Sequence, residues 1–309
     1  MYIQRTVRGR VEFSGVALHS GLYVDVSVSP AKENTGIVFV RTDIDTKPQI
    51  QALWNNVVDT ELSTVIGVKN GPRIATIEHL MSALKGLNID NAIVEVSGPE
   101  LPILDGSSVV YIDAIKKVGI VEQNETGKYI QVVKPVSVSV DDKFLYFLPS
   151  SRFAVTCRVN YKHPSVGLQH FEYKHSDFSY ATHVAKAKTF GFLNEVEKLK
   201  EKGLIQGGSF ENAIVLDEEK VINKDFMSYE DEFVRHKILD IIGDMGLVGQ
   251  SRLLAHVVAY KSGHSLHSAA LKELAERSSY FKIVGEPVEI DEKAFAEQAL
   301  SILQTIPTF

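Results

Sequence analysis

Hydrophobic and polar positions alternate along much of the first fifty residues. Gly, Pro and Asn separate three alternating or β-branched runs, which are VRGRVEF, LYVDVSVSP and TGIVFVRTD. A period of two residues is typical of strands that have one buried face. The pattern then predicts a helix at TIEHLMSALKGL with Thr76 as its N-cap, a strand at NAIVEVSG and a helix near VVYIDAIKKVG. The first half is therefore predicted to combine a β-sheet with two helices.

The second half repeats this order of elements. Predicted strands at YIQVVKPVSVSV, KFLYFLPS and FAVTCRVNY precede a helical insert, LNEVEKLKEKGL, and a strand, NAIVLD. The long helix YEDEFVRHKILDIIGDMG, the strand AHVVAYKSG, a loop with His264 and the helix SAALKELAERS complete the series. We interpret the chain as a tandem duplication of one α+β unit, each a sheet layer packed against helices. The polar stretch 122–128 is predicted to be a linker between domains 1–123 and 129–309.

The long helix carries a polar stripe. His236, Asp240 and Asp244 follow at steps of four residues, which drift by only about 40° per step around a helix. Val234 and Ile238 lie on the other side. Periodicity alone leaves two interpretations open: the stripe faces water, or it faces a cavity and holds a metal ion.

Two residues of this stripe have the chemistry of metal ligands. A catalytic zinc ion usually takes three ligands from His and carboxylates, and His236 and Asp240 reach one ion from a single helix. A third ligand and a base must come from elsewhere, and Glu78 and His79 in the first helix are candidates for both. In a duplicated fold this helix lies opposite the long one, at the domain interface. Taken singly, Glu78 is better explained by the helix dipole, and His79 is better explained as a capped or core histidine.

Composition narrows the class of protein. The net charge of the 309 residues is −6 without a basic cluster, so nucleic acid is not an expected partner. No apolar run approaches the ~18 residues of a transmembrane segment, and the N-terminus lacks the apolar core of a signal peptide. The single cysteine, Cys157, excludes an intramolecular disulfide and argues against a closed structural zinc site. We therefore expect a cytoplasmic protein, and a monomer.

Five longer stretches carry a family resemblance. They are GVALHSG, TIEHLMSALKGLNIDNAIVEVSGPELPILDGS, KTFGFLNEVEKLKEKGLIQGGSFENAIVLD, YEDEFVRHKILDIIGDMGLVG and YKSGHSL. Through them the chain resembles, nearly end to end, the UDP-3-O-acyl-N-acetylglucosamine deacetylases, zinc enzymes of lipid A biosynthesis in Gram-negative bacteria. The resemblance implies hydrolysis of the N-acetyl group of this UDP-sugar lipid precursor. Another zinc amidohydrolase acting on an N-acyl sugar, or a non-catalytic metal-binding protein, is the alternative.

The resemblance also implies residue roles. Zinc would be held by His79, His236 and Asp240, although Fe(II) suits the same ligands. Glu78 would be the base that activates water, and His264 would assist the transition state and protonate the departing amine. The remaining implied roles are orientation of His264 by Asp244, an oxyanion hydrogen bond from Thr189, and substrate contacts from Lys237, Phe190, Phe192, Leu18, His19, Gly208 and Ser63.

An insert near residues 185–206 resembles a βαβ segment that forms an apolar passage for the acyl chain. Its apolar stripe, which includes Phe192, Val196 and Leu199, has helical spacing, although such a stripe is also explained by packing on the domain. The chain departs from the family in having Lys188 where Arg is usual and His267 where Asn is usual. Ser63 falls near a position that is often Cys. Lys lacks the forked donors of Arg, which puts a bidentate contact at Lys188 in doubt.

Overall fold

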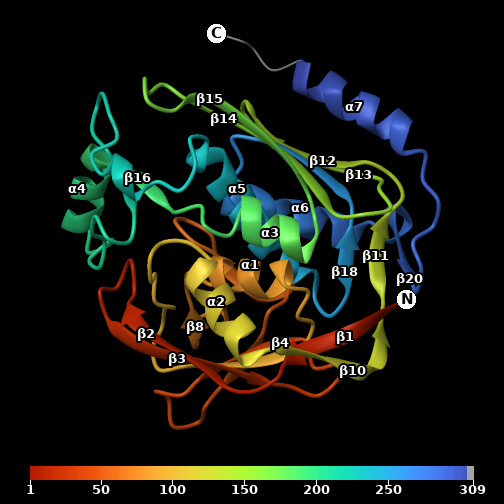
Figure 1. Ribbon diagram of the computed structural model, residues 1–309, viewed down its shortest axis with the longest axis horizontal. Helices are drawn as coiled ribbons and strands as arrows, with labels where there is room; N and C mark the ends of the chain where they lie inside the picture. The colour runs from red at the N-terminus through yellow and green to blue at the C-terminus, as the bar shows by residue number, and fades with distance from the viewer. Residues whose placement is uncertain (305–309) are drawn as a thin grey trace.

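Two five-stranded sheets form the outer layers of the protein in its computed structural model, and helices fill the space between them (Figure 1). The structure describes residues 1–304. In Figure 1 the N-terminal sheet lies at the bottom and the C-terminal sheet at the top. The mixed α+β architecture predicted from the sequence is confirmed.

The two sheets have the same topology. The first has the order β2 (Val11–Val16), β3 (Tyr23–Pro30), β9 (Ala92–Val96), β4 (Ile37–Arg41) and β5 (Gln49–Gln51). The second has the order β12 (Val136–Val140), β13 (Lys143–Leu148), β19 (His256–Tyr260), β14 (Ala154–Tyr161) and β15 (Gly167–Lys174). In each sheet only the third and fourth strands run parallel, β9 with β4 and β19 with β14. Repetition of both order and direction agrees with the predicted duplication.

The helix layer joins the two halves. It contains α1 (Glu78–Gly86), α2 (Val109–Val118), α3 (Asp177–His183), α5 (Glu232–Met245) and α6 (His264–Glu276). Helices α1 and α5 pack directly against each other, and Gly243 allows their close approach because a Cβ there would lie 2.2 Å from the carbonyl oxygen of Glu78. Side chains from both helices, such as Leu80 and Ile238, belong to one continuous core.

Helix α5 is buried on all sides. Ile238 is fully buried, and Asp240 and Asp244 on the opposite face are each only 2% exposed. The interpretation that the polar stripe faces water is therefore wrong. Buried charged groups are rare unless they are paired or bind a metal, so this stripe requires a chemical explanation.

Smaller elements complete the fold. They are β1 (Tyr2–Val7) with β10 (Ile120–Gly127), β6 (Val57–Asp59) with β7 (Val65–Gly67) and β8 (Arg73–Ile74), β11 (Tyr129–Val132) with β18 (Arg252–Leu254) and β20 (Phe281–Val284), and the parallel pair β16 (Phe190–Phe192) and β17 (Ile214–Leu216) with α4 (Leu193–Glu201) between them. The segment β16–α4–β17 is the βαβ insert that the resemblance implied. Helix α7 (Glu292–Gln304) packs Phe295 and Ala299 on the outer face of the C-terminal sheet. No helix within residues 1–304 is long and apolar enough to cross a membrane.

Three local predictions were wrong. Most of the stretch predicted as a linker, residues 122–128, lies in β10, because its backbone pairs with β1. Thr76 does not cap α1: its hydroxyl donates to Glu100 Oε1 over 3.0 Å, and Ile77 is the residue before the helix. His264 is the first residue of α6 rather than part of a loop. The domain boundaries at residues 123 and 129 stay a prediction, and the predicted end at Phe309 lies outside the described residues.

Candidate metal centre

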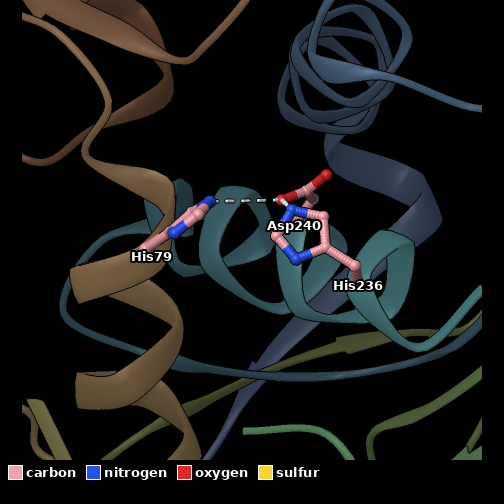
Figure 2. A group of neighbouring side chains, drawn as sticks. All are labelled: His79, His236 and Asp240. Atoms are coloured by element: carbon pink, nitrogen blue, oxygen red, sulfur yellow. Dashed lines mark ion pairs between the residues drawn. The ribbon is translucent and has the colours of Figure 1, made fainter. Parts of the chain in front are cut away.

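Three buried side chains meet where α1 crosses α5. His79 extends from α1, and His236 and Asp240 extend from successive turns of α5 (Figure 2). Asp240 Oδ1 lies 3.4 Å from His236 Nε2 and 4.0 Å from His79 Nε2. One ligand atom from each residue lies within 4.8 Å of the other two. The predicted meeting of two helices from separate halves is thus present in the fold.

The hydrogen bonding of this cluster fits a cation. Asp240 Oδ2 accepts a hydrogen bond of 2.9 Å from Lys237 Nζ, whereas Oδ1 is buried and has no hydrogen-bond partner among the described residues. His236 Nδ1 donates to the carbonyl of Ala187 over 3.1 Å, which leaves its Nε2 free to bind a metal. Because buried polar atoms are rarely unpaired, the orphan oxygen between two imidazoles marks a place for a positive ion.

The protonation states also suit a metal. Burial, and then the neighbouring His236, lowers the pKa of His79 to about 3, and burial likewise lowers the pKa of His236. Burial opposes ionisation of Asp240, but Lys237 and the imidazoles outweigh it and hold the pKa of this carboxyl well below its usual range. Two neutral imidazoles and one carboxylate are typical ligands of a catalytic zinc ion with an open position.

Glu78 lies next to this cluster, and Thr64 donates a hydrogen bond to it. Its Oε2 accepts a hydrogen bond of 3.0 Å from the backbone N–H of Thr64, and its Oε1 lies 4.0 Å from His264 Nε2. Burial raises the pKa of Glu78 to about 8, although His264 opposes the shift. A carboxylate whose pKa lies near the working pH is well suited to accept a proton in a reaction.

A second buried network surrounds Asp244. Its Oδ2 accepts hydrogen bonds from His264 Nδ1 at 2.8 Å and from His267 Nδ1 at 2.7 Å, and its Oδ1 accepts one from the Thr64 hydroxyl at 2.5 Å. These donors satisfy both oxygens of Asp244. The side chains of Asp244, His264 and His267 are close enough to hold a metal ion, but their hydrogen bonds account for this arrangement without a metal.

This network favours the protonated form of His264. Burial opposes protonation, but Asp244 and then Glu78 outweigh it and raise the pKa of His264 to about 9. Burial also opposes ionisation of Asp244, but His264 and His267 lower the pKa of this carboxyl to about 2. At neutral pH the site therefore pairs an imidazolium with a carboxylate.

A cavity of about 310 Å³ joins the two networks. Its wall contains Leu18, His19, Leu62, Thr76, Glu78, His79, Ile103, Tyr161, Thr189, Phe190, Gly191, Phe192, Glu195, His236, Lys237, Asp240 and His264. Gly208 and Ser63, which were predicted to contact substrate, do not line it, and Asp244 lies behind His264. Each ring nitrogen of His19 is buried without a hydrogen-bond partner in the described part of the chain. An imidazole of this kind is free to bind a polar group in the cavity.

Sequence reasoning missed several residues of this site, and Thr64 and Tyr161 are two of them. Thr64 contacts both networks, and Tyr161 lies with its ring centroid 5.7 Å from those of Phe190 and Phe192. Thr64 directly precedes the short strand β7, and no local pattern distinguishes it from other threonines next to strands. Tyr161 ends β14 and reads as an ordinary strand residue.

Lys188 and His267, the two residues that differ from those usual in the family, have different surroundings in the structure. Lys188 does not line the cavity: its Nζ donates to Ser228 Oγ over 3.0 Å and lies 4.6 Å from the ring centroid of Phe226. The loss of a forked guanidinium therefore does not change the cavity wall. His267, in contrast, is fully buried and adds a hydrogen bond to Asp244.

The residues that match known proteins include both helices that carry the cluster. Residues 4–276 match the family model described as LpxC, UDP-3-O-acyl N-acetylglycosamine deacetylase. The chain is also 45% identical over 277 residues to the UDP-3-O-acyl-N-acetylglucosamine deacetylase of Syntrophus aciditrophicus (strain SB). That alignment covers 90% of this chain and 87% of that protein.

Proposed function

The chain belongs to the UDP-3-O-acyl-N-acetylglucosamine deacetylase family, and we propose that it works with a zinc ion held by His79, His236 and Asp240. It is an amide hydrolase of lipid A biosynthesis: it converts UDP-3-O-acyl-N-acetylglucosamine to UDP-3-O-acyl-glucosamine and acetate. Members of this family are metalloenzymes. The observation that best supports the ligand set is the buried, unbonded Oδ1 of Asp240 between two neutral imidazoles.

Hydrolysis of an amide needs a nucleophile, a base and an acid. When bound to such a ligand set, zinc lowers the pKa of a coordinated water to about 7 and polarises a carbonyl oxygen. Glu78, next to the cluster on the cavity wall, accepts the proton of the attacking water. Thr64 holds the carboxylate in place through its backbone N–H.

His264 supplies the proton that the leaving amine requires. Its imidazolium faces the cavity through Nε2, while Nδ1 donates to Asp244 over 2.8 Å. An amine is a poor leaving group unless it is protonated, and the positive charge also stabilises the negative charge of the tetrahedral transition state. Asp244 orients the ring and keeps it charged.

Replacing His264 by glutamine is expected to remove the alkaline limb of the pH–rate profile. The pKa of His264 is raised to about 9, so the acid is present below that pH and is lost above it. Wild-type kcat/KM should fall about tenfold per pH unit above the pKa, whereas the variant should be about 10²-fold slower at pH 7 and should not fall above the pKa of His264. His170→Gln, at a half-exposed histidine of β15 outside the cavity, is the control. An unchanged limb in the His264 variant would contradict the role.

The rest of the cavity wall suits a glycolipid nucleotide. Thr189 donates to the developing oxyanion, and the ammonium of Lys237 and the free nitrogens of His19 bind polar groups of the substrate. Phe190 and Phe192 provide flat apolar faces for the sugar and the nucleotide. The half-buried Val196 and Leu199 of α4 continue this apolar surface into the insert, where we place the acyl chain.

We assign Thr64 a positioning role, because it links the base to the acid. Its N–H binds Glu78, its hydroxyl binds Asp244, and its Oγ lies 3.2 Å from His264 Nδ1. Thr64→Val keeps the shape but removes the hydroxyl, and we expect kcat to fall about tenfold with KM nearly unchanged. Thr64→Ser should restore kcat because the hydroxyl returns. Equal loss in the serine and valine variants, measured by steady-state kinetics, would indicate a packing role instead.

The function itself is tested by two measurements on the same sample. Purified protein should contain about one zinc or Fe(II) ion per chain by elemental analysis and should release acetate from UDP-3-O-acyl-N-acetylglucosamine. Dialysis against a chelator should abolish the release, and added zinc should restore it. Full activity after complete removal of metal would overturn the proposal.

A further inference from the structure

A second cavity lies at the C-terminal ends of α1 and α5, away from the cavity of the metal centre. Its volume is about 610 Å³, and it shares no lining residue with the first cavity. Lys85 near the end of α1 and Ile242 and Met245 near the end of α5 belong to its wall, together with residues of β18 and α3. A volume of this size is within the range of small-molecule sites, which often lie between domains.

Much of this wall is apolar. The apolar side chains are Ile89, Phe153, Ile242, Met245, Val248, Leu253 and Leu254. Phe178, on the first turn of α3, belongs to the same wall although it is 76% exposed. An apolar wall with a few polar groups is typical of a site that binds an organic molecule rather than a free inorganic ion.

One cation on this wall lacks an anionic partner. Lys85 Nζ donates to the carbonyl of Gly249 over 3.3 Å, and among the described residues no carboxylate forms an ion pair with it. Its stem packs against Gly246, the residue that follows α5, because a Cβ there would lie 2.7 Å from Lys85 Cγ. Burial lowers the pKa of Lys85 to about 8, so the ammonium still forms at neutral pH. An ammonium carries three donors, and one carbonyl leaves two of them for a ligand.

The two carboxylates on this wall, Asp90 and Asp177, are already neutralised. Asp90 accepts hydrogen bonds from Arg252 at 3.0 and 2.8 Å and from the backbone N–H of Arg5 at 2.8 Å. Asp177 accepts from Arg5 Nη1 at 3.1 Å and from Asn88 Nδ2 at 2.5 Å. Lys85 is therefore left as a positive charge beside an apolar surface, and a group of opposite charge complements it.

We propose that this cavity binds an amphiphilic organic anion. A carboxylate or phosphate monoester head group contacts Lys85, and an apolar chain lies over Ile242, Met245 and Val248. The site is separate from the reaction, yet its ligand touches the far ends of the two helices that carry Glu78 and the metal ligands. It therefore stabilises the packing of α1 against α5.

Calorimetric titration with four probes that each carry a chain of eight carbons tests the proposal. Octanoate and octyl phosphate present the anionic head in its two forms, octanol lacks the charge, and octyltrimethylammonium reverses it. Wild-type protein should bind one or both anions at one site in addition to any binding in the acyl passage. Lys85→Met removes the charge and keeps an unbranched apolar side chain one atom shorter, and we expect it to weaken anion binding at least about tenfold without changing octanol binding.

Two further variants locate the binding. Lys272→Met, at a lysine of α6 that is 64% exposed, is the matched control and should bind like the wild type. Val248→Trp fills the cavity while Lys85 remains, and it should remove the site for every probe. Matching thermal unfolding midpoints without probe establish that the variants are folded. Equal anion affinity in wild type and Lys85→Met, or no saturable anion binding in the wild type, would overturn the proposal. Metal content and acetate release of Lys85→Met distinguish this outcome from failure of the proposed function.

Discussion

Glu78→Gln is expected to lower kcat by about 10²–10⁴-fold while the metal content stays at the wild-type level. Glutamine has the same shape and still accepts the hydrogen bond from the Thr64 N–H, so the local structure should persist. It does not accept the proton of the attacking water, and it also removes the negative charge that helps to raise the pKa of His264. Steady-state acetate release together with elemental analysis measures both quantities on one preparation.

The control for this variant is Glu197→Gln on the exposed face of α4, which should retain full turnover. A loss of less than about tenfold in the Glu78 variant would remove Glu78 from the role of base. A loss of metal together with activity would instead make Glu78 part of the ligand set.

His79→Ala is expected to lose most of its metal on dialysis against a chelator and, with it, nearly all activity. The substitution removes one of three ligands, and the remaining pair comes from a single helix. Asp240→Asn tests the same site with almost no change in volume. It should also lose metal, because the uncharged amide is a poor replacement for the carboxylate with its unbonded Oδ1. Elemental analysis before and after dialysis measures the loss.

A folding defect would imitate this result, so the unfolding midpoint of each metal-free variant is compared with that of metal-free wild type. His170→Ala, at a histidine outside the site, should retain metal and activity. If the His79 variant keeps its full metal content after the chelator, its role as a ligand is contradicted.

Helices α1 and α5 show what the periodicity of a sequence predicts and what it does not. The four-residue steps of His236, Asp240 and Asp244 are local, and the helix they predict is α5. The local sequence does not determine whether that stripe faces water or another helix. It depends on Gly243, which lets the Glu78 carbonyl approach, and on β-sheets that enclose α1 and α5 from both sides.

The duplication could be predicted because each half repeats the same order of patterns. The pairing of β10 with β1 could not, since the polar stretch around Glu122 has no apolar alternation and gains its partner from the start of the chain. Thr76 shows the same limit: a hydroxyl before a helix favours a cap, but Glu100 binds it from 24 positions away.

The sequence by itself determined the family, because the family rests on long matching stretches, and through that resemblance it predicted three metal ligands and a base. Only the tertiary structure decided that Thr64 joins Glu78 to Asp244, which lies 180 positions further along the chain, and that His267 shares Asp244 with His264. It alone showed the second cavity beside Lys85. The reason is physical: spacing along one helix or strand follows from backbone geometry, whereas contacts between distant segments depend on how the whole chain packs.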